Sequence, residues 1–500
     1  MSTWPLDPAP KLSNAIAAME LRPGGKFPRL VSYSWFAALT LREPVLTRLP
    51  LPTEDLGLFT DLYELTMAQV YFRQQMFAPA TFSLFIRQYP PNRGYLVSAG
   101  LEDVLDYLTA FRFEDATLDY LRSVGRFTDG FLNYLARLRF TGSLRGIPEG
   151  RLFFANEPLL EITAPMVEAQ LVETFVINQM NLQVTLATKA ARCVWAAQGR
   201  PLADFASRRT HGVDAALKMA RCSYIAGFQS TSNVLAAKRY DIPAAGTMAH
   251  SFVSSFTSEI DAFRAYAEVF PDATVLLLDT FDTLEGARNA VTVAKEMETE
   301  GHRLRAVRLD SGDFDSLSRQ VRRILDESGL EHVQILASGG LDEYQLETLA
   351  REDAPIDSFG VGTKAGVSAD APWSDMAYKL VCYDGRPIMK LSEGKSYMPG
   401  AKQIYRVTDP QGQFSRDIVA TEDEDLPEGE PLLEPVMSDG RHSGPRPSLE
   451  EMRQRLVEDF QRLDGLFKAL QNPADYPVAT SPRLEKLAAQ VRDAIGRRKG

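Results

Sequence analysis

Short apolar runs alternate with amphipathic stretches in the middle of the chain. Four runs have the pattern of a buried strand that ends in polar or small residues: "ATVLLLDT" (273–280), "LRAVRLDSGD" (304–313), "HVQILASGG" (332–340) and "IDSFGVGT" (356–363). The three segments between them carry apolar residues at helical spacing, and the first two end at Gly301 and Gly329. The predicted strand ends near Asp279, Asp310, Ser338 and Gly362 therefore recur every 24 to 31 residues.

This regular alternation of strands and helices predicts successive right-handed βαβ units and an α/β fold with a parallel sheet. We favour an irregular TIM-like parallel α/β barrel because polar residues end every strand. An open doubly wound sheet would give the same local pattern. In both folds ligands bind at the carboxyl ends of the strands, where these polar and glycine-rich turns lie.

The two ends of the chain have a different pattern. Residues 1–52 are broken by Pro and Gly and lack a signal-peptide pattern, so we expect an irregular extension. Residues 423–448 are rich in Pro, Gly and acidic residues and predict a surface loop. Residues 449–470 and 482–498 have apolar residues at helical spacing and predict two helical segments.

Composition narrows the class of protein. The 500 residues carry a net charge of −11, which argues against a general nucleic-acid binder but leaves room for a local basic pocket. The three cysteines form no CxxC pair, so we expect neither a disulfide framework nor a zinc site. This cysteine usage predicts a reducing compartment and a cytoplasmic location. The longest apolar runs are far shorter than a membrane span.

Two glycine-rich turns follow predicted strands, in "ASGGL" (337–341) and "GVGTKAG" (360–366). Backbone N–H groups in such turns can approach a phosphate, helped by the positive end of a following helix. One glycine pair is a weak signal. Two such turns at equivalent places in neighbouring βα units support the hypothesis that this edge of the sheet binds a phosphate.

Charged residues near the strand ends allow two interpretations each. In "RLDSGD", Arg308 and Asp310 are either a buried ion pair, with Asp313 as a helix N-cap, or groups that bind an anionic or aromatic ligand, sugar hydroxyls or Mg²⁺. In "DFASRRTHG" (204–212), the paired arginines Arg208 and Arg209 beside Phe205 suit a phosphate or are simply solvated.

His250 follows the strand-like stretch "PAAGTMA" (243–249). It is either a core histidine with satisfied hydrogen bonds or a reactive group, since a neutral imidazole can accept a phosphoryl group. Tyr63 lies on an amphipathic stretch, and from its own surroundings we expect packing rather than ligand stacking.

An ordered series of motifs resembles the nicotinate phosphoribosyltransferase family. The matching stretches are "TDLYELTMA" (60–68), "DFASRR" (204–209), "GFQSTSNVLAAKRYDIPAAGTMAHSF" (227–252), "RLDSGD" (308–313), "SFGVGT" (358–363) and "YKLVCYDGRPIMKLSEGKSYMPGAKQIYR" (378–406). The resemblance runs from about residue 55 to about 410 and is highly specific, because long motifs agree in order.

The resemblance implies a barrel at 176–380 and a second α+β domain built from the N- and C-terminal segments 53–175 and 381–500. It implies an obligate homodimer with shared active sites. It also implies a reaction of NAD biosynthesis that joins nicotinate to phosphoribosyl pyrophosphate, with Mg²⁺ present and ATP hydrolysis coupled through a phosphohistidine.

The resemblance also implies a role for each matching residue. His250 would be phosphorylated, Asp310 would hold the ribose hydroxyls, and Asp279 is a weaker candidate for ordering Mg²⁺. The expected substrate-binding residues are Thr247 and Arg308 at nicotinate, Phe205 and the other subunit's Tyr63 around its ring, Arg208 at a phosphate, Ser232 at the nicotinate carboxylate side, and the loops Gly339–Gly340 and Gly362–Thr363 at the 5′-phosphate. An aromatic clamp suits an electron-poor pyridine.

Three alternatives remain at this stage. Nicotinamide phosphoribosyltransferase, the sibling, has an aspartate where this chain has Ser232, and an aspartate would repel a carboxylate substrate. Quinolinate phosphoribosyltransferase needs a multi-arginine pocket that the sequence does not display. A catalytically silent nucleotide-binding homologue would have lost His250, Arg308 or Asp310, and all three are present. Two departures from the family pattern are residues 1–52 and Ala206, which stands where a glycine is expected.

Overall fold

The computed structural model describes residues 52–391 and 397–498. All of them fall in one compact unit, Thr47–Gly500. Apart from Pro52, the predicted N-terminal extension lies outside the described residues. The predicted boundaries at 175/176 and 380/381 lie inside this unit and stay predictions.

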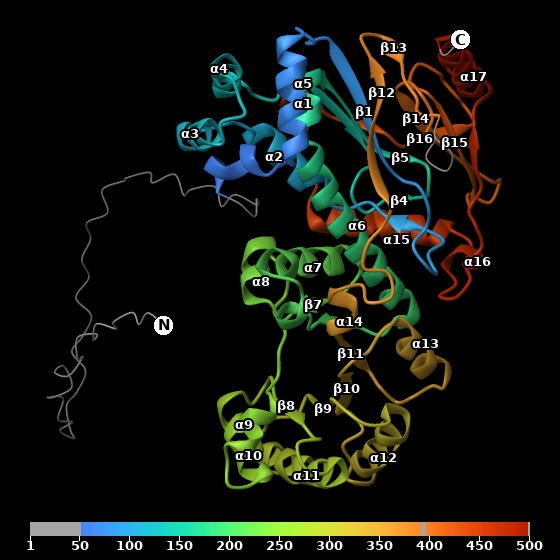
Figure 1. Cartoon of the computed structure of the whole chain (residues 1–500). Coiled ribbons are helices and arrows are strands. Elements are labelled where there is room, and N and C mark those ends of the chain that lie inside the picture. Colours follow the sequence, from blue (N-terminus) through green and yellow to red (C-terminus); the bar gives the residue numbers. More distant parts are fainter. Residues whose placement is uncertain (1–51, 392–396, 499–500) are drawn as a thin grey trace, which may run out of the picture. The chain divides into compact units, whose positions relative to one another are not determined.

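Six strands form a parallel sheet in the order β7-β6-β11-β10-β9-β8 (Figure 1). In that order they span Ser230–Thr231, Leu202–Asp204, Ser358–Val361, Gln334–Ser338, Ala306–Leu309 and Val275–Leu277. Every neighbouring pair is parallel, which confirms the predicted parallel sheet. The predicted closed barrel is not found, because β7 and β8 are the edge strands and do not pair with each other in the described residues.

The helices between these strands begin and end close to the predicted positions: α11 at Thr283–Thr299, α12 at Phe314–Glu327 and α13 at Glu343–Arg351. Each has an aspartate N-cap whose carboxylate accepts a backbone N–H of the first turn, namely Asp282, Asp313 and Asp342. The N-cap interpretation of Asp313 is therefore confirmed. These caps fix where each helix leaves the carboxyl edge of the sheet.

A second, antiparallel sheet has seven strands in the order β13-β12-β1-β5-β3-β17-β18. They span Arg386–Pro387, Met376–Tyr383, Pro79–Ile86, Pro158–Pro165, Ser143–Gly146, Glu434–Ser438 and Arg441–His442. Segments far apart in the sequence meet here, since β1 pairs along its whole length with β12. The sheet thus draws its strands from residues 79–165 and 376–442, on either side of the parallel sheet in the chain.

Two smaller sheets complete this part of the molecule. Four strands, β16-β14-β15-β19, span Gly429–Pro431, Lys402–Thr408, Phe414–Thr421 and Val478–Thr480, and β2 (Leu96–Val97) pairs with β4 (Leu152–Phe153). The prediction of an irregular loop at 423–448 was wrong, because β16, β17 and β18 lie inside it. These strands are very short and pair with distant strands, which local composition does not reveal.

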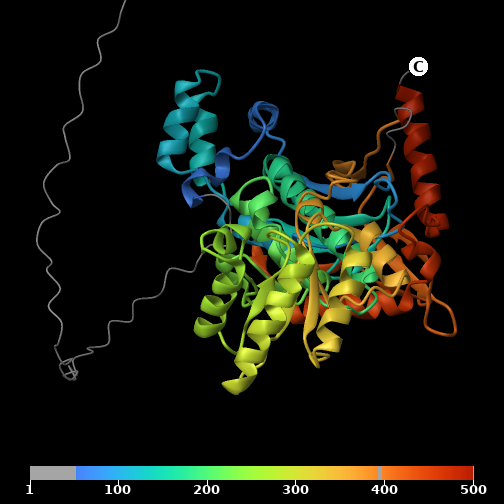
Figure 2. The ribbon, with the colours of Figure 1, turned by 90° about the horizontal axis from the view of Figure 1, so that it is seen from below.

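Helices cover both sheets. Around the antiparallel sheet and the two smaller sheets lie η1 (Thr53–Leu58), α1 (Leu62–Arg73), α2 (Leu101–Ala110), α3 (Asp115–Ser123), α4 (Asp129–Arg137), α5 (Met166–Leu171), α6 (Glu173–Ala196), α15 (Leu449–Arg462), α16 (Gly465–Lys468) and α17 (Pro482–Arg498), and α15 also packs on α7. In two views at right angles α3 and α4 lie on one flank and α17 on the other (Figures 1 and 2). The predicted helix at 449–470 is confirmed but breaks into α15 and α16 at Leu463.

The remaining short elements accompany the parallel sheet: η2 (Ser207–Arg209), α7 (Val213–Ala226), α8 (Val234–Tyr240), α9 (His250–Ser254), α10 (Glu259–Val269) and α14 (Thr363–Gly366). Two large apolar clusters hold the fold together, one centred on the parallel sheet and one on the antiparallel sheet. In the ranges described, no helix combines the length and apolar character needed to cross a bilayer.

Candidate active site

Arg308 is the most constrained side chain at the carboxyl edge of the parallel sheet. It lies in β9, and its side chain is 10% exposed. Its Nε donates to Ser338 Oγ at 2.8 Å, Nη1 donates to Thr247 Oγ1 at 2.9 Å and to the Met248 carbonyl at 3.0 Å, and Nη2 donates to Asp310 Oδ1 at 2.6 Å. Four of its five N–H groups are therefore used to fix the guanidinium. Within the described part of the chain, one N–H of Nη2 has no acceptor and can bind a ligand.

Asp310 shares this network. Ser338 Oγ also donates to Asp310 Oδ1, so one buried hydroxyl bridges the arginine and the carboxylate. Burial alone would raise the pKa of Asp310, but the hydrogen bond from Ser338 and the nearby Arg308 cation outweigh it and lower that pKa. Asp310 is thus held as a carboxylate. The interpretation of Arg308 and Asp310 as an ion pair is confirmed, and the geometry is also compatible with a ligand role.

His250 lies beside this pair but does not follow a strand. Residues 243–249 form no strand and make only one isolated bridge, Thr231 with Ala244, so the strand-like interpretation was wrong. His250 is the first residue of α9, and its side chain is 45% exposed. Nε2 lies 3.6 Å from Asp310 Oδ2, and Nδ1 lies 3.2 Å from Thr280 Oγ1. The imidazole is therefore a half-exposed group at the sheet edge and not a core histidine.

Asp279, at the end of β8, has the properties of a cation ligand. Its Oδ2 accepts the backbone N–H of Asp310 at 3.2 Å and a hydrogen bond from the Ser311 hydroxyl. Its Oδ1 is buried and has no hydrogen-bond partner among residues 52–391 and 397–498. No cluster of three or more potential metal ligands is found in residues 52–391 and 397–498. A single free carboxylate oxygen still fits Mg²⁺, which usually takes one or two carboxylates together with water and substrate phosphates.

Phe205, just after β6, lies against the glycine of the neighbouring strand end. A Cβ on Gly360 would come within 2.4 Å of the Phe205 ring, so only glycine leaves room for it. The ring centroid is 5.7 Å from the Arg308 guanidinium carbon. Ala206 has φ −86° and ψ −21°, ordinary values for alanine, and it packs against Gly366. The alanine in place of the family's glycine is thus accommodated without backbone strain.

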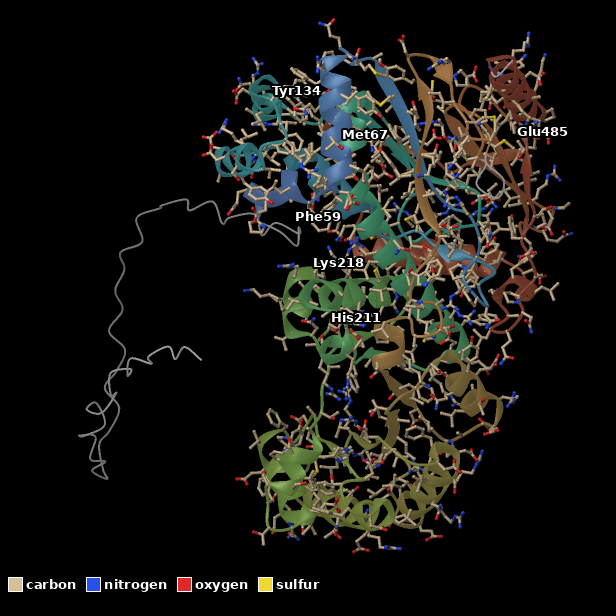
Figure 3. All side chains as sticks on the ribbon, in the orientation of Figure 1. Phe59, Met67, Tyr134, His211, Lys218 and Glu485 are labelled. Carbon is tan, nitrogen blue, oxygen red and sulfur yellow. The ribbon has the colours of Figure 1, made fainter. Side chains whose placement is uncertain are left out.

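The basic segment after Phe205 faces solvent. Arg208 and Arg209 in η2 are exposed. His211 is exposed too and precedes α7, the helix that carries the buried Lys218 (Figure 3). Ser232 helps to line a hollow of about 470 Å³ between η2 and α8. Arg208 and Ser232 therefore lie near the edge of the sheet without joining the Arg308 network.

The two glycine-rich loops lie side by side at the ends of β10 and β11. Gly339 and Gly340 have φ of +104° and +70°, and a Cβ on Gly339 would lie 1.8 Å from the Asp310 carbonyl oxygen. Both the conformation and the close approach require glycine there. Lys364, next to Thr363, reaches Asp342 of the other loop at 2.8 Å and so ties the two loops together.

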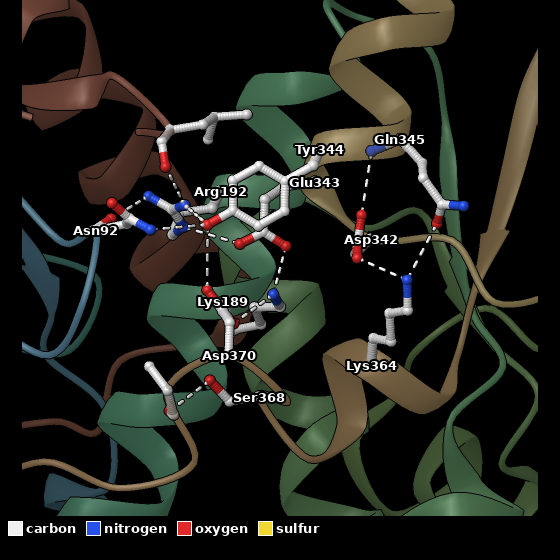
Figure 4. Close-up of polar contacts among 12 residues, drawn as sticks. Asn92, Lys189, Arg192, Asp342, Glu343, Tyr344, Gln345, Lys364, Ser368 and Asp370 are labelled. Carbon is white, nitrogen blue, oxygen red and sulfur yellow. Dashed lines mark hydrogen bonds and ion pairs between the residues drawn. The ribbon is translucent and has the colours of Figure 1, made fainter. Parts of the chain in front are cut away.

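A buried charge network anchors these loops to α6 (Figure 4). Glu343, the first residue of α13, has no exposed surface and pairs with Lys189 and, at 3.0 Å, with Arg192. Asp370, which follows α14, pairs with Lys189 at 2.6 Å and with Arg93 at 2.8 Å. Lys189 of α6 thus binds one acid from α13, the helix after the first loop, and one from the segment after α14, the helix that follows the second loop.

Tyr63 is not brought to the site within this chain. Its helix α1 lies among the elements of the antiparallel sheet, away from β8–β11 (Figure 1), and its side chain is exposed. The expectation of core packing for Tyr63 was therefore wrong. The next residue, Glu64, is fully buried and accepts hydrogen bonds from Thr60 and, at 2.6 Å, from Thr174. Burial raises the pKa of Glu64 to about 7 despite both bonds.

Glu64 predicts a pH dependence of stability. The pKa of Glu64 is about 7 in the fold and ordinarily 4.5, so the folded state favours the protonated carboxyl. The stabilisation that this gives is fully present below about pH 4.5 and is lost as the pH rises through about 7. We expect Glu64→Gln to raise the free energy of unfolding near pH 8 by about 1–2 kcal/mol and to change it little near pH 5, as measured by urea unfolding. Glu54→Gln, at an exposed position, is the control. Equal effects of Glu64→Gln at both pH values would contradict the prediction.

Sequence reasoning missed three residues of this site. Ser338 was noted only as a strand end, although it bridges Arg308 and Asp310. Thr280 contacts His250, and Lys364 joins the loops. Each of the three directly follows or precedes a predicted site residue. A hydroxyl or amine side chain next to such a residue at a strand end was the feature of the sequence that could have indicated them.

The arrangement defines a class of protein. A parallel sheet presents a fixed arginine, two carboxylates, a half-exposed histidine and two glycine-rich loops at the carboxyl ends of its strands. This is the architecture of an α/β enzyme that binds an anionic, phosphorylated substrate.

Comparison with known proteins identifies the family. The nicotinate phosphoribosyltransferase N-terminal domain model matches residues 58–181, the family model matches 201–383 and the C-terminal domain model matches 428–488. A nicotinate phosphoribosyltransferase of Mycobacterium tuberculosis is 50% identical over 442 residues, 88% of this chain and 94% of that protein. One of Bacillus subtilis is 38% identical over 461 residues, 86% of this chain and 93% of that protein.

A solved structure agrees with these relatives. Human nicotinic acid phosphoribosyltransferase superposes with a TM-score of 0.79 at 30% identity, covering 86% of this chain and 99% of that one. The chain belongs to the nicotinate phosphoribosyltransferase family.

Proposed function

We propose that this enzyme transfers the phosphoribosyl group of phosphoribosyl pyrophosphate to nicotinate, giving nicotinate mononucleotide and pyrophosphate in NAD biosynthesis. The observation that carries the proposal is Arg308, a fixed cation with one free N–H, beside the ring of Phe205. The ring of an aromatic carboxylate can stack on Phe205, and its negative charge can accept a hydrogen bond from Arg308. Ser232 places no negative charge near the substrate, which favours nicotinate over nicotinamide.

The reaction develops charge in two places. The bond from ribose C1 to the pyrophosphate oxygen breaks while the pyridine nitrogen forms a bond to C1, so the sugar becomes positive and the leaving group negative. Asp310 would accept hydrogen bonds from the ribose hydroxyls, close to the developing positive charge. The loops Gly339–Gly340 and Gly362–Thr363 would take the 5′-phosphate, and exposed Arg208 would meet a phosphate at the entrance.

A divalent cation fits the same edge. The free Oδ1 of Asp279 would hold Mg²⁺ together with substrate oxygens. When bound, Mg²⁺ would neutralise the charge that develops on the leaving pyrophosphate.

His250 is the proposed acceptor of a phosphoryl group from ATP. The contact of Nδ1 with Thr280 and the approach of Nε2 to Asp310 orient the ring, while its half-exposed edge is open to a nucleotide. A neutral ring nitrogen would attack the γ-phosphorus, the bond to ADP would break, and water would later release phosphate. A phosphorylated side chain adds a charge of about −1.5 to −2, which would help to order Mg²⁺ and favour a closed site.

We further propose a homodimer with shared sites and a cytoplasmic location. Tyr63 is 48% exposed, and its helix α1 packs on α5 and α4, among the elements of the antiparallel sheet. A second subunit would bring its Tyr63 to the open face of the nicotinate ring opposite Phe205.

The test of this function is product formation in the presence and absence of ATP. Purified enzyme with phosphoribosyl pyrophosphate, Mg²⁺ and either nicotinate or nicotinamide is assayed for mononucleotide by chromatography. We expect product from nicotinate that rises with ATP. Product from nicotinamide alone would favour the sibling activity, and no product from either would favour a silent homologue.

His250→Ala separates coupling from transfer. We expect the variant to lose stimulation by ATP and to retain slow, uncoupled turnover, because the arginine and carboxylate network does not depend on the imidazole. The control is His302→Ala, which removes a surface imidazole that contacts Asp272. A His250→Ala enzyme that ATP still stimulates fully would contradict the phosphohistidine.

A further inference from the structure

A pocket that the active site does not use opens between α6, α7, α13, α15 and α16. Its volume is about 720 Å³, within the range of small-molecule sites. Its walls are mostly apolar and include Val194, Trp195, Leu456 and Phe460. None of its lining residues belongs to the active site described above.

Lys468 is the unusual member of this pocket. It is 7% exposed, and its Nζ lies 4.5 Å from the centroid of the Trp195 ring. Nζ donates one hydrogen bond, at 2.9 Å, to the Phe460 carbonyl. No carboxylate lies within 4.0 Å of Nζ in the part of the chain that the structure describes, and this carbonyl is its one hydrogen-bond acceptor there.

This arrangement leaves the ammonium group without a carboxylate in contact. Burial lowers the pKa of Lys468, and Asp464, which makes no ion pair with it, offsets this effect only in part. An ammonium group has three donors, and buried lysines are nearly always paired with an acid. By contrast with Lys468, the buried Lys189 of the same protein pairs with two acids, Glu343 and Asp370. A carboxylate that enters the pocket from solvent could accept the remaining N–H groups of Lys468.

The rest of the lining limits the ligand to a compact, largely apolar molecule. Trp195 and Phe460 offer aromatic surface, while Gln198 and Gln461 offer neutral hydrogen-bonding groups. Glu347 is the one acidic residue in the lining and makes no ion pair with Lys468. A second positive or strongly polar group on the ligand is therefore not required.

We propose that this pocket is a second ligand site, which binds a small aromatic carboxylate through Lys468. The apolar body lies along Trp195, Leu456 and Phe460, and the carboxylate accepts charge-assisted hydrogen bonds from Nζ. Glu347 lies on α13, the helix that directly follows the Gly339–Gly340 loop, so a bound ligand touches an element of the active site.

The test uses 2-naphthoate, with naphthalene-2-methanol as the neutral analogue and 2-naphthylmethylammonium as the cationic one. Binding to the full chain is measured by calorimetry and by quenching of tryptophan fluorescence. We expect the carboxylate to bind at least tenfold more tightly than either analogue. Lys468→Met should remove this preference, because it keeps the length of the side chain and deletes its charge.

Three further variants distinguish this site from the active site and from a folding defect. Val457→Glu places an acid at an exposed helical position in the lining and should weaken binding of 2-naphthoate, whereas Val269→Glu, exposed on α10, should not. Arg308→Met should leave the binding that depends on Lys468 unchanged. Absence of binding to the wild type, equal binding of the neutral analogue, or loss of binding in Arg308→Met would each overturn the proposal.

Discussion

Replacement of Arg308 by methionine is expected to lower kcat/KM for nicotinate by at least about a hundredfold, because a substrate ring misplaced by about 1 Å commonly loses that factor in rate. The change removes the cation beside Phe205 and also breaks the links to Thr247, Ser338 and Asp310. Steady-state kinetics with nicotinate and phosphoribosyl pyrophosphate measure the loss. Arg308→Lys keeps the charge but not the fork of donors, so we expect an intermediate value.

Two readouts show that the effect belongs to the site. Arg305→Met changes an exposed arginine just before the same strand and should keep kcat/KM within about twofold, as expected for a surface substitution. The Arg308 cation helps to lower the pKa of Asp310, so the acid limb of the kcat/KM profile should move to higher pH in Arg308→Met. A variant with wild-type kcat/KM and an unshifted profile would contradict the proposed role.

Replacement of Glu343 by glutamine is expected to lower the free energy of unfolding by about 3 kcal/mol, because buried Arg192 loses its acid and buried Lys189 keeps only Asp370. Glu343 has no exposed surface and pairs with both Lys189 and Arg192. Since it begins α13, we also expect a higher KM for phosphoribosyl pyrophosphate. Urea unfolding and steady-state kinetics measure the two effects.

The matched control is Asp115→Asn, because Asp115 is also the acidic first residue of a helix but is exposed. It should change stability by less than about 0.5 kcal/mol, as surface substitutions usually do. The double variant Glu343→Gln with Lys189→Met should recover part of the loss, because the unpaired lysine is then gone. Additive losses in the double variant would show that the pair is not the source of the effect.

The sequence was most informative where structure depends on local pattern. The strands that end near Asp279, Asp310, Ser338 and Gly362 and the helices between them are periodic over short windows, and all are found. Parallel neighbours present their carboxyl ends at one edge, so the residues at those ends were bound to meet. The contact of Arg308 with Asp310 follows from their spacing of two along β9.

The features that the sequence did not predict depend on contacts with residues far away in the chain. Closure of the sheet needs pairing between its two edge strands, and no local pattern encodes it. The stretch 243–249 has strand-like composition but meets only one bridging residue, Thr231. Between 423 and 448, proline and glycine suggested a loop, yet β17 finds a partner in β3. The bridge through Ser338 also joins two strands, so neither strand alone predicts it.

The pairing of β1 with β12 has a consequence for how the protein is made. Ala80 of β1 meets Tyr383 of β12, and the whole parallel sheet lies between them in the chain. At typical synthesis rates of about 5–20 residues per second, β12 leaves the ribosome roughly 15–60 seconds after β1. Until then one edge of β1 has no neighbour, and an unpaired edge favours aggregation. Early pairing with β5 covers only the other edge of β1. The edge that waits for β12 therefore needs protection, for example by a chaperone, until the second half of the chain has been synthesised.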